Sequence, residues 1–381
     1  MMIYDKKNPF AARLVENRLL TQAGSTKETR HCVIDIAGSG LSYTCGDSLG
    51  VYPANPPEMV ADMIAALKAS GDELVNLPNE AQPRPLREAL LRSLSLAGPT
   101  TRTLKALQQR VTATDERELL ESLLEPQNRS ATQAWLAERE YIDLLEEYPS
   151  AVFKPQDFVD LLRKLQPRLY SIASSPKIYP ETIHLTVAVV RYQTNQRERR
   201  GIASTWLAER VPINQPKVPA FIVPSHFRLP ASDAADLIMV GPGTGVAPFR
   251  AFIQERGARG AQGRSWLFFG ERNQSTDYLY GEDWETWHKQ GVLTRLDLAW
   301  SRDQDERIYV QHKLLARAKP IWEWLSGGAY FYVCGDAKRM AKDVDQALHC
   351  IIREQGDLDD AAAVAFVRQL RKEKRYQRDV Y

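Results

Sequence analysis

The chain has 381 residues, which is long for one typical domain and enough for two or three. Its hydrophobic fraction of 44% and charged fraction of 26% are those of an ordinary soluble globular protein. A net charge of +2 gives no reason to expect a nucleic-acid or membrane partner, and no apolar run approaches the roughly 20 residues that span a bilayer. The four cysteines form no C-x-x-C pair, which argues against a zinc site or a disulfide framework. We therefore expect a cytoplasmic protein without a metal.

Two strand-rich segments flank a long helical segment in the first 230 residues. Short alternating runs, cut by turn residues, occur from about residue 29 to 52, and strand patterns return at 168–191. From 56 to about 167, apolar residues repeat at helical spacing in stripes that Pro and Gly separate. The pattern predicts a β domain of residues 1–55 and 168–230, interrupted by a helical insertion at 56–167.

The last third of the chain alternates strands with helices. Apolar runs typical of buried strands occur at 237–240, 266–270, 296–300 and 330–334, and a final helix is expected at about 358–372. This order predicts a parallel sheet with helices on both faces, the nucleotide-binding type, over residues 231–381.

A glycine-rich loop, Gly-Pro-Gly-Thr-Gly-Val-Ala-Pro at 241–248, follows the first of these strands and opens a helix. Glycines allow the backbone to approach a phosphate, and the start of the next helix attracts one. The loop is neither a G-x-G-x-x-G fingerprint nor a P-loop. A tight turn without a ligand therefore remains an alternative.

The strand at 168–175 and the loop at 201–207 also carry residues that suit a nucleotide. Alternation places Arg168 and Tyr170 on one face, where arginine suits a diphosphate and tyrosine suits a flat ring. Ser171 can hydrogen-bond a ring nitrogen, and Ser204 can join backbone N–H groups in holding a phosphate. A surface strand with a fortuitous arginine is the alternative.

A third candidate segment follows the strand at 296–300. Ser301, Arg302, Arg307 and Tyr309 supply the hydroxyl, the two guanidiniums and the ring that a ribose 2′-phosphate and an adenine require. The acidic residues at positions 303, 305 and 306 leave a solvated charged loop as the alternative.

Taken together, these segments resemble the FAD/NADPH module of the diflavin reductases, a ferredoxin–NADP reductase type of flavoprotein. The similarity is strongest to the sulfite reductase [NADPH] flavoprotein alpha component. The strings that carry it extend from about residue 8 to 381: NPF at 8–10, GD at 46–47, VYPAN at 51–55, RLYSIASSP at 168–176, GIASTWL at 201–207, FRLP at 227–230, GPGTGVAPFRAFIQER at 241–256, WSRDQ at 300–304, YVQ at 309–311, YVCGDAKRMAKDV at 332–344 and RYQRDVY at 375–381. The resemblance implies an antiparallel FAD-binding β-barrel with a helical connecting insertion, followed by a parallel-sheet, Rossmann-like NADPH-binding domain.

The resemblance also implies roles for individual residues. Expected contacts to FAD come from Arg168, Tyr170, Ser171, Thr186, Ala188, Tyr192, Gly201, Ile202, Ala203 and Ser204. Expected contacts to NADPH come from Gly243, Thr244, Ser301, Arg302, Arg307, Tyr309, Gln311 and Asp343. The catalytic residues around the hydride path are expected to be Ser171, Cys334, Asp379 and Tyr381, and Tyr381 is also expected to stack on the flavin. Taken singly, Cys334 fits a buried strand cysteine and Tyr381 a frayed terminus.

The resemblance begins within about ten residues of Met1, so we expect no N-terminal flavodoxin-like FMN domain. The electron outlet is then a sulfite reductase hemoprotein or a separate FMN, flavodoxin or ferredoxin carrier; a shortened chain is the alternative. Tyr381 stands where P450 reductases have tryptophan, which favours the sulfite reductase branch. We expect an NADPH-oxidising flavoenzyme of assimilatory sulfite reduction. A free-standing NADPH:flavodoxin or ferredoxin reductase and a non-catalytic docking subunit remain alternatives.

Overall fold

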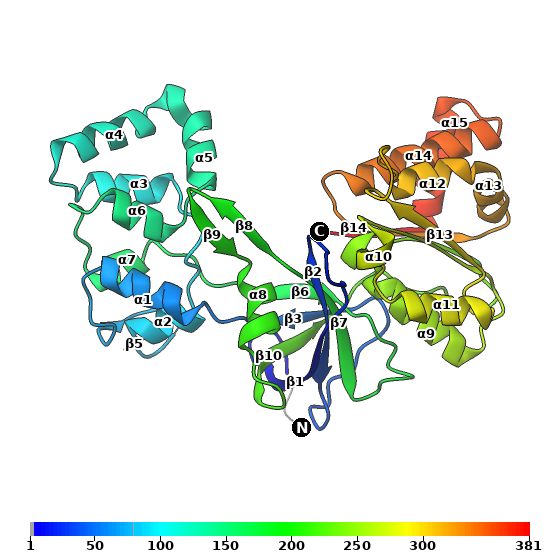
Figure 1. The fold of residues 1–381 in the computed structure, drawn as a ribbon, viewed down its shortest axis with the longest axis horizontal. Coiled ribbons are helices and arrows are strands. Elements are labelled where there is room, and N and C mark those ends of the chain that lie inside the picture. The colour runs from blue at the N-terminus through cyan, green and yellow to red at the C-terminus, as the bar shows by residue number, and fades with distance from the viewer. Residues whose placement is uncertain (1–3, 79) are drawn as a thin grey trace. The chain divides into compact units, whose positions relative to one another are not determined.

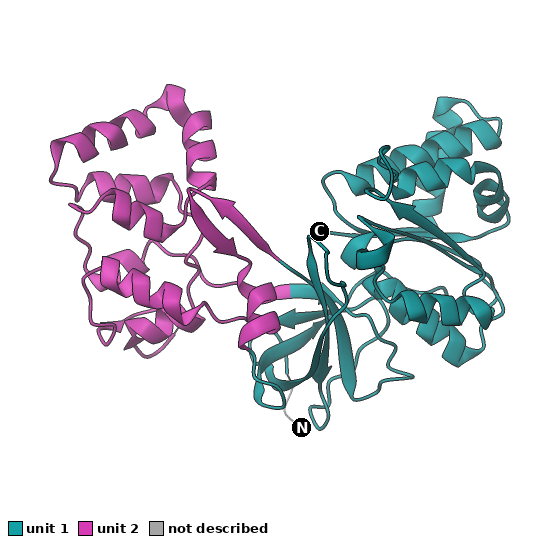
Figure 2. Ribbon diagram, in the orientation of Figure 1, with its two compact units in different colours: residues 1–51, 169–189, 211–381 teal, residues 52–168, 190–210 magenta. Residues whose placement is uncertain are grey.

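The computed structural model describes residues 4–78 and 80–381 of the chain. It divides into two compact units, which Figure 2 distinguishes by colour. The first unit extends to Val51 and also contains Leu169–Val189 and Val211–Tyr381, whereas the second contains Tyr52–Arg168 and Val190–Arg210. Each unit is described by itself below.

An antiparallel sheet opens the first unit. Its strands are β1 (Phe10–Leu19), β2 (Glu28–Asp35), β3 (Ser48–Val51), β6 (Arg168–Ser171), β7 (Thr182–Val189) and β10 (Pro216–Val223). They lie in the order β6-β3-β10-β1-β2-β7, and a bridge between Ile172 and Leu185 joins the two edges. The sheet therefore closes on itself, which confirms the predicted antiparallel β-barrel.

A five-stranded parallel sheet forms the rest of the first unit (Figure 1). Its order is β13-β12-β11-β14-β15, with strands β11 (Leu237–Val240), β12 (Ser265–Glu271), β13 (Arg295–Trp300), β14 (Tyr330–Gly335) and β15 (Tyr376–Val380). The helices that accompany it are η3 (Gly243–Val246), α9 (Ala247–Arg259), α10 (Gln274–Asp277), α11 (Gly281–Lys289), α12 (Val310–Ala316), α13 (Ala318–Ser326), α14 (Met340–Gln355) and α15 (Asp360–Lys372). The predicted Rossmann-like sheet is confirmed.

Alternation along the central strand creates a core on each face of this sheet. Leu237 and Met239 of β11 point into one cluster, which contains side chains of α9 and α11. Ile238 and Val240 point into the other, which contains side chains of α12 to α15. Figure 1 shows these two helix layers on opposite sides of the strands. Because both faces are covered, the strands are apolar throughout, which made them recognisable in the sequence.

The second unit is built mainly of helices. They are α1 (Pro57–Ala66), α2 (Leu86–Arg92), α3 (Thr101–Gln108), α4 (Thr114–Leu124), η1 (Pro126–Asn128), α5 (Arg129–Ala137), α6 (Tyr141–Glu147) and α7 (Pro155–Val159). Between them lies a short pair of strands, β4 (Leu74–Val75) and β5 (Arg84–Pro85). A single apolar cluster fills the space between the helices, as the predicted stripes require.

Residues 190–210 also belong to the second unit, although the sequence pattern placed them in the β domain. They form the hairpin β8 (Arg191–Thr194) and β9 (Arg197–Arg200), followed by α8 (Ile202–Thr205) and the π-helical turn η2 (Trp206–Arg210). The hairpin is a separate two-stranded sheet and is held by charged side chains of α6. The predicted domain limits stay a prediction.

Two strands at the ends of the chain had no clear sequence signal. The strand pattern was expected to begin at about residue 29, but β1 begins at Phe10. Its sequence, FAARLVENRL, exposes many polar side chains and so lacks a strong apolar alternation. The segment after the final helix adds β15, whose pairing partner β14 lies about 40 residues earlier. No helix within the described residues is long and apolar enough to cross a membrane.

A buried polar cluster joins the barrel to the parallel-sheet part of the first unit. The hydroxyl of Tyr280 lies 2.9 Å from His31 Nδ1 and 2.8 Å from Thr186 Oγ1. Arg250 Nη1 lies 3.4 Å from His184 Nδ1, and its guanidinium lies over the ring of Tyr280. Burial, assisted by the charge of Arg250, lowers the pKa of His31 to about 2 and that of His184 to about 3. Both imidazoles are therefore neutral in the folded protein at neutral pH.

This cluster predicts a loss of stability in mild acid. The two histidines take up protons near pH 6.5 only after unfolding, so each contributes up to about 1.4 kcal/mol per pH unit of lost stability below that pH. The urea midpoint, followed by tryptophan fluorescence, should fall between pH 7 and pH 5. His184→Gln should flatten this dependence, and His226→Gln, at an exposed position, should not. An equal slope in all three proteins would contradict the assignment.

Candidate functional site

The candidate residues of the nicotinamide half lie where the parallel strands end. Residues 241–246 follow β11, residues 301–309 follow β13, and residues 336–339 follow β14. The carboxyl ends of parallel strands meet at one edge of a sheet, and this edge is where such sheets bind ligands. The structure therefore brings together segments that are almost 100 residues apart.

A pocket of about 580 Å³ occupies this edge. It is lined by Lys27, Pro242, Gly243, Gly270, Glu271, Arg272, Ala299, Ser301, Arg302, Arg307, Tyr309, Val310, Gln311, Asp336, Arg339, Met340 and Asp343. Of the expected NADPH contacts, only Thr244 is outside this lining. The volume lies within the range usual for small-molecule sites.

Three arginines of the pocket have guanidiniums without a close internal partner in the part of the chain that the structure describes. The guanidiniums of Arg302, Arg307 and Arg339 make no ion pair or hydrogen bond with any residue that the structure describes. Arginine presents a planar array of donors that suits phosphate oxygens. Several unpaired guanidiniums around one pocket therefore fit a phosphorylated nucleotide.

Several acidic residues at or near this pocket have partners within the protein. Asp303 accepts hydrogen bonds from Asn273 Nδ2 and Gln274 N, both at 2.9 Å, and is not part of the lining. Glu271 forms an ion pair with Lys27. Backbone N–H groups, first that of Arg339, hold the pKa of Asp336 below its usual value. Of the loop at 301–309, Ser301, Arg302, Arg307 and Tyr309 line the pocket, which supports the expectation of a binding loop.

The glycine-rich loop has no room for side chains. A Cβ atom on Gly241 would lie 2.6 Å from Gly245 O, and one on Gly245 would lie 2.1 Å from Cys334 O. Gly243 has a φ of +58° and lines the pocket. These positions keep the backbone bare at the edge of the pocket, as a phosphate-binding loop requires.

Three of the expected catalytic residues meet at the junction of the barrel and the parallel sheet. Ser171 Oγ donates to Asp379 Oδ2 at 2.7 Å, and Cys334 Sγ lies 3.7 Å from the same oxygen. Cys334 and Asp379 face each other across the β14–β15 pairing. Burial, and then the charge of Asp379, raise the pKa of the Cys334 thiol well above its usual value. The thiol therefore stays protonated at neutral pH.

Tyr381, the fourth expected catalytic residue, lies beside this group. Its backbone N–H donates to Gly335 O at 3.1 Å, and its carbonyl accepts from Ala337 N at 3.1 Å. Its hydroxyl lies 2.9 Å from Thr244 Oγ1. The ring is 63% exposed. The backbone of Tyr381 is thus held in place, so Tyr381 is not a frayed chain end. Its ring remains accessible to a ligand.

The expected FAD contacts of the first unit differ in accessibility. Tyr170 is half-buried beside Ser171 on β6, and Ala188 on β7 is exposed. Thr186 is buried, and its hydroxyl is used by Tyr280. The hydroxyl of Thr186 thus has a partner within the protein, and the predicted contact of Thr186 with FAD stays a prediction.

The other expected FAD contacts belong to the second unit. Arg168 is exposed and has no partner among the described residues, and Tyr192 is 52% exposed. Gly201 caps the start of α8, and Ile202, Ala203 and Ser204 are the first residues of that helix. An unpaired arginine and an open tyrosine ring fit a diphosphate and an adenine. Their placement against the residues of the first unit stays a prediction.

Some pocket residues escaped the sequence analysis. Arg339 lies within the string at 332–344 that carries the family resemblance, so the sequence analysis could have included it. Lys27 comes from the β1–β2 loop of the barrel, and nothing in its neighbourhood in the sequence pointed to this pocket. Among the described residues, no group of three or more His, Cys, Asp or Glu side chains is placed so that it could hold a metal ion.

Comparisons with known families agree with this geometry. Residues 3–206, more than half of the chain, match the family described as FAD binding domain. The chain belongs to this FAD-binding family. Residues 239–346 match the oxidoreductase NAD-binding domain, which covers the glycine-rich loop and the pocket. The two domains confirm the prediction of a flavoprotein oxidoreductase with FAD and NADPH as cofactors.

Several curated relatives of this flavoprotein bear the name sulfite reductase [NADPH] flavoprotein alpha-component. The protein of Bacillus subtilis is 44% identical over 381 residues, which are 99% of this chain and 62% of the relative. Those of Vibrio cholerae and Escherichia coli O9:H4 are each 44% identical over 379 residues, again 99% of this chain, and 60% and 62% of the relatives. The chain thus spans about three fifths of the length of these relatives.

The unpaired arginines predict selectivity for the phosphorylated dinucleotide. Arg302→Ala should raise KM for NADPH by about 10- to 100-fold, because a charge-assisted contact to the 2′-phosphate is lost, and should leave KM for NADH nearly unchanged. Steady-state kinetics with both dinucleotides measure this difference. Glu306→Gln, in the same loop but outside the pocket, is the matched control. An equal loss with both dinucleotides would place Arg302 elsewhere.

The exposed ring of Tyr381 predicts a role in excluding nicotinamide. Tyr381→Ala should increase activity with NADH, because a ring that covers the flavin no longer has to be displaced. Thr244→Val removes the partner of the Tyr381 hydroxyl but keeps the ring, so it should raise activity with NADH less than Tyr381→Ala does. The ratio of kcat/KM for NADPH and NADH is the measurement. A ratio unchanged by Tyr381→Ala would rule out the stacking role.

Proposed function

We propose that this flavoprotein oxidises NADPH and passes the electrons to an acceptor protein, as the flavoprotein component of an assimilatory sulfite reductase. The observation that carries the NADPH half is the pocket at the edge of the parallel sheet, with unpaired Arg302, Arg307 and Arg339. The names of the relatives support the sulfite reductase half. The helical unit adds support, because plain ferredoxin–NADP reductases lack such an insertion.

Bound FAD and NADPH supply the hydride-transfer and electron-transfer chemistry, and the residues of the chain bind and orient them. Arg302 and Arg307 hold the 2′-phosphate, and Tyr309 offers a ring to the adenine. The bare backbone around Gly243 accepts the pyrophosphate. Tight positioning of the two reacting rings is the main contribution that a protein makes to such a reaction.

The group around Asp379 tunes the charge at the reacting end. Its carboxylate would favour the positive charge that develops on a nicotinamide bound beside it. Ser171 donates to this carboxylate and fixes its orientation. Cys334, as a neutral thiol, adds a small polarizable surface without adding a second negative charge. Retention of this group speaks against the non-catalytic docking subunit.

The expected partner is a sulfite reductase hemoprotein, reached directly or through a separate FMN, flavodoxin or ferredoxin carrier. The four cysteines are all unpaired, which is consistent with the proposed cytoplasmic location. No residue of the described chain identifies the partner surface, so this part of the proposal rests on the relatives.

Two linked measurements test the proposal. The purified protein should show a flavin absorbance spectrum that NADPH bleaches rapidly, and NADH slowly, without oxygen. It should then support NADPH-dependent sulfide formation when mixed with a sulfite reductase hemoprotein, with or without added flavodoxin. Ferricyanide reduction serves as the control that needs no partner protein. Bleaching and ferricyanide reduction without sulfide formation would leave a general NADPH reductase, and flavin that ignores NADPH would defeat the whole proposal.

A further inference from the structure

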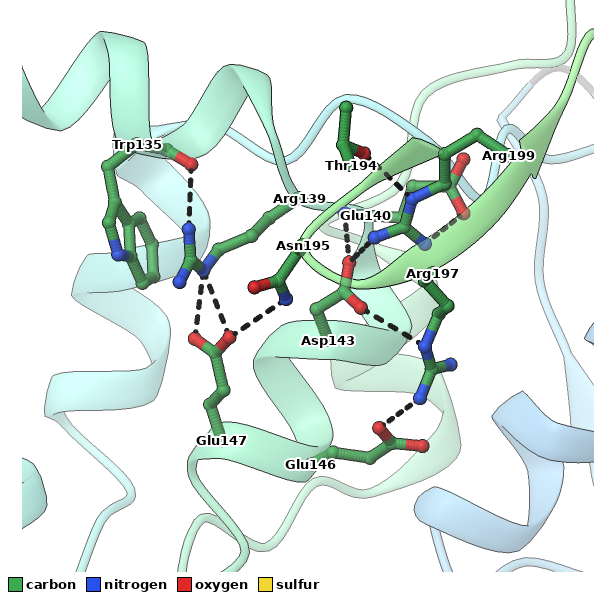
Figure 3. A network of polar contacts seen from close by, with 10 residues as sticks. All are labelled: Trp135, Arg139, Glu140, Asp143, Glu146, Glu147, Thr194, Asn195, Arg197 and Arg199. Carbon is green, nitrogen blue, oxygen red and sulfur yellow. Dashed lines mark hydrogen bonds and ion pairs between the residues drawn. The ribbon is translucent and has the colours of Figure 1, made fainter. Parts of the chain in front are cut away.

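A cluster of charged side chains fastens the β8–β9 hairpin to helix α6 of the second unit, as Figure 3 shows. The guanidinium of Arg199 lies at its centre and is only 2% exposed. Arg199 Nη1 donates to Glu140 Oε2 at 3.1 Å, and Nη2 donates to Asp143 Oδ2 at 2.5 Å. Arg199 Nε donates to Thr194 Oγ1 at 3.0 Å. All three nitrogens of the guanidinium are thus engaged.

Weaker contacts surround this buried centre. Arg197 Nε lies 3.4 Å from Asp143 Oδ1, and its Nη2 reaches Glu146 at the surface. Asn195, at the turn of the hairpin, donates from Nδ2 to Glu147 Oε1 at 3.1 Å. Every one of these acceptors belongs to α6, so the helix holds the hairpin along its whole length (Figure 3).

Stability alone does not account for the buried centre. Removing a guanidinium and two carboxylates from water is costly, and apolar residues of similar volume often stabilise a fold as well or better. Burial raises the pKa of Glu140, and the charge of Arg199 acts against that rise. What the buried pairs offer and an apolar contact lacks is one defined position of the hairpin on the helix, because each donor has a fixed acceptor.

The hairpin leads directly into the loop expected to bind the FAD diphosphate. Gly201 N donates to Val190 O at 2.9 Å, which ties the loop to the base of the hairpin. Ser204 Oγ accepts from Val190 N and donates to Gly201 O, both at 3.1 Å. A Cβ atom on Gly201 would lie 2.7 Å from Ser204 Oγ, so the turn is tightly packed. A displacement of the hairpin would therefore displace this loop.

We propose that Arg199, Glu140 and Asp143 are positioning residues for FAD, which hold the loop at Gly201–Ser204 in the shape that binds the flavin nucleotide. The inference rests on the proposed function and deepens it. It assigns the helical unit a part in cofactor affinity, since Glu140 and Asp143 belong to α6 and its N-cap. A loop that is already ordered in the free protein raises affinity, because no conformational entropy is lost in ordering it on binding.

The dissociation constant of FAD tests this inference. Apoprotein is titrated with FAD, and quenching of flavin fluorescence reports binding. Asp143→Asn, which keeps the volume and removes the charge, should raise the dissociation constant about tenfold or more. Glu146→Gln, which breaks an exposed pair on the same helix, should change it less than about twofold. Should Asp143→Asn fail to fold, Arg199→Lys keeps the charge, loses the second hydrogen-bonding arm, and should also weaken FAD.

A pair of double variants separates positioning from general weakening. Asp143→Asn should add little to the loss caused by Ser204→Ala, because both act on the same loop. It should add fully to the loss caused by Arg168→Ala, an expected FAD contact outside that loop. Additivity in both pairs, or an unchanged FAD constant with a lower melting temperature of the apoprotein, would overturn the inference. Wild-type protein that binds no FAD would instead defeat the proposed function itself.

Discussion

The arrangement of the first unit depends on one buried guanidinium. Arg250 lies on α9, just after the glycine-rich loop, and donates to Ala173 O at 2.9 Å and to Asp283 Oδ2 at 2.8 Å. Ala173 follows β6, the strand that ends with Ser171. A buried arginine is tolerated only with its partners in place. The contacts of Arg250 therefore fix α9, which follows the glycine-rich loop, against the segment that follows β6. The hydrogen bond between Ser171 and Asp379 depends on this arrangement of the barrel and the parallel sheet.

Arginine serves two opposite purposes in this chain. Arg250 and Arg199 are buried, have several internal partners each, and fix one segment against another. Arg302, Arg307 and Arg339 are exposed around a pocket, and their guanidiniums form no ion pair or hydrogen bond with the described residues. The first kind defines the shape of the protein, and the second kind leaves its binding capacity for a phosphate. Composition alone cannot distinguish them, since both count equally as positive charge.

Local sequence patterns predicted most of the fold and part of the candidate site. The parallel strands were recognisable because they are buried on both faces, and Arg302 and Tyr309 lie within one short segment after β13. Lys27 joins the same pocket from the barrel, and only tertiary structure brings it there. Likewise, Arg199 stands in the run RERR, which looks like a solvated face, although it is among the most buried large side chains. The sequence by itself does not show which residues, far apart along the chain, become neighbours in the fold.

The order of strands in the barrel has a consequence for synthesis on the ribosome. β10 lies between β1 and β3 and pairs with both, yet it is made about 165 residues after β3. The sheet therefore stays open until β10 has been synthesised, with strand edges unpaired. The helices of residues 57–159 are synthesised between β3 and β10. They make mainly local contacts, which form quickly. The insertion is thus able to fold before the barrel around it can close.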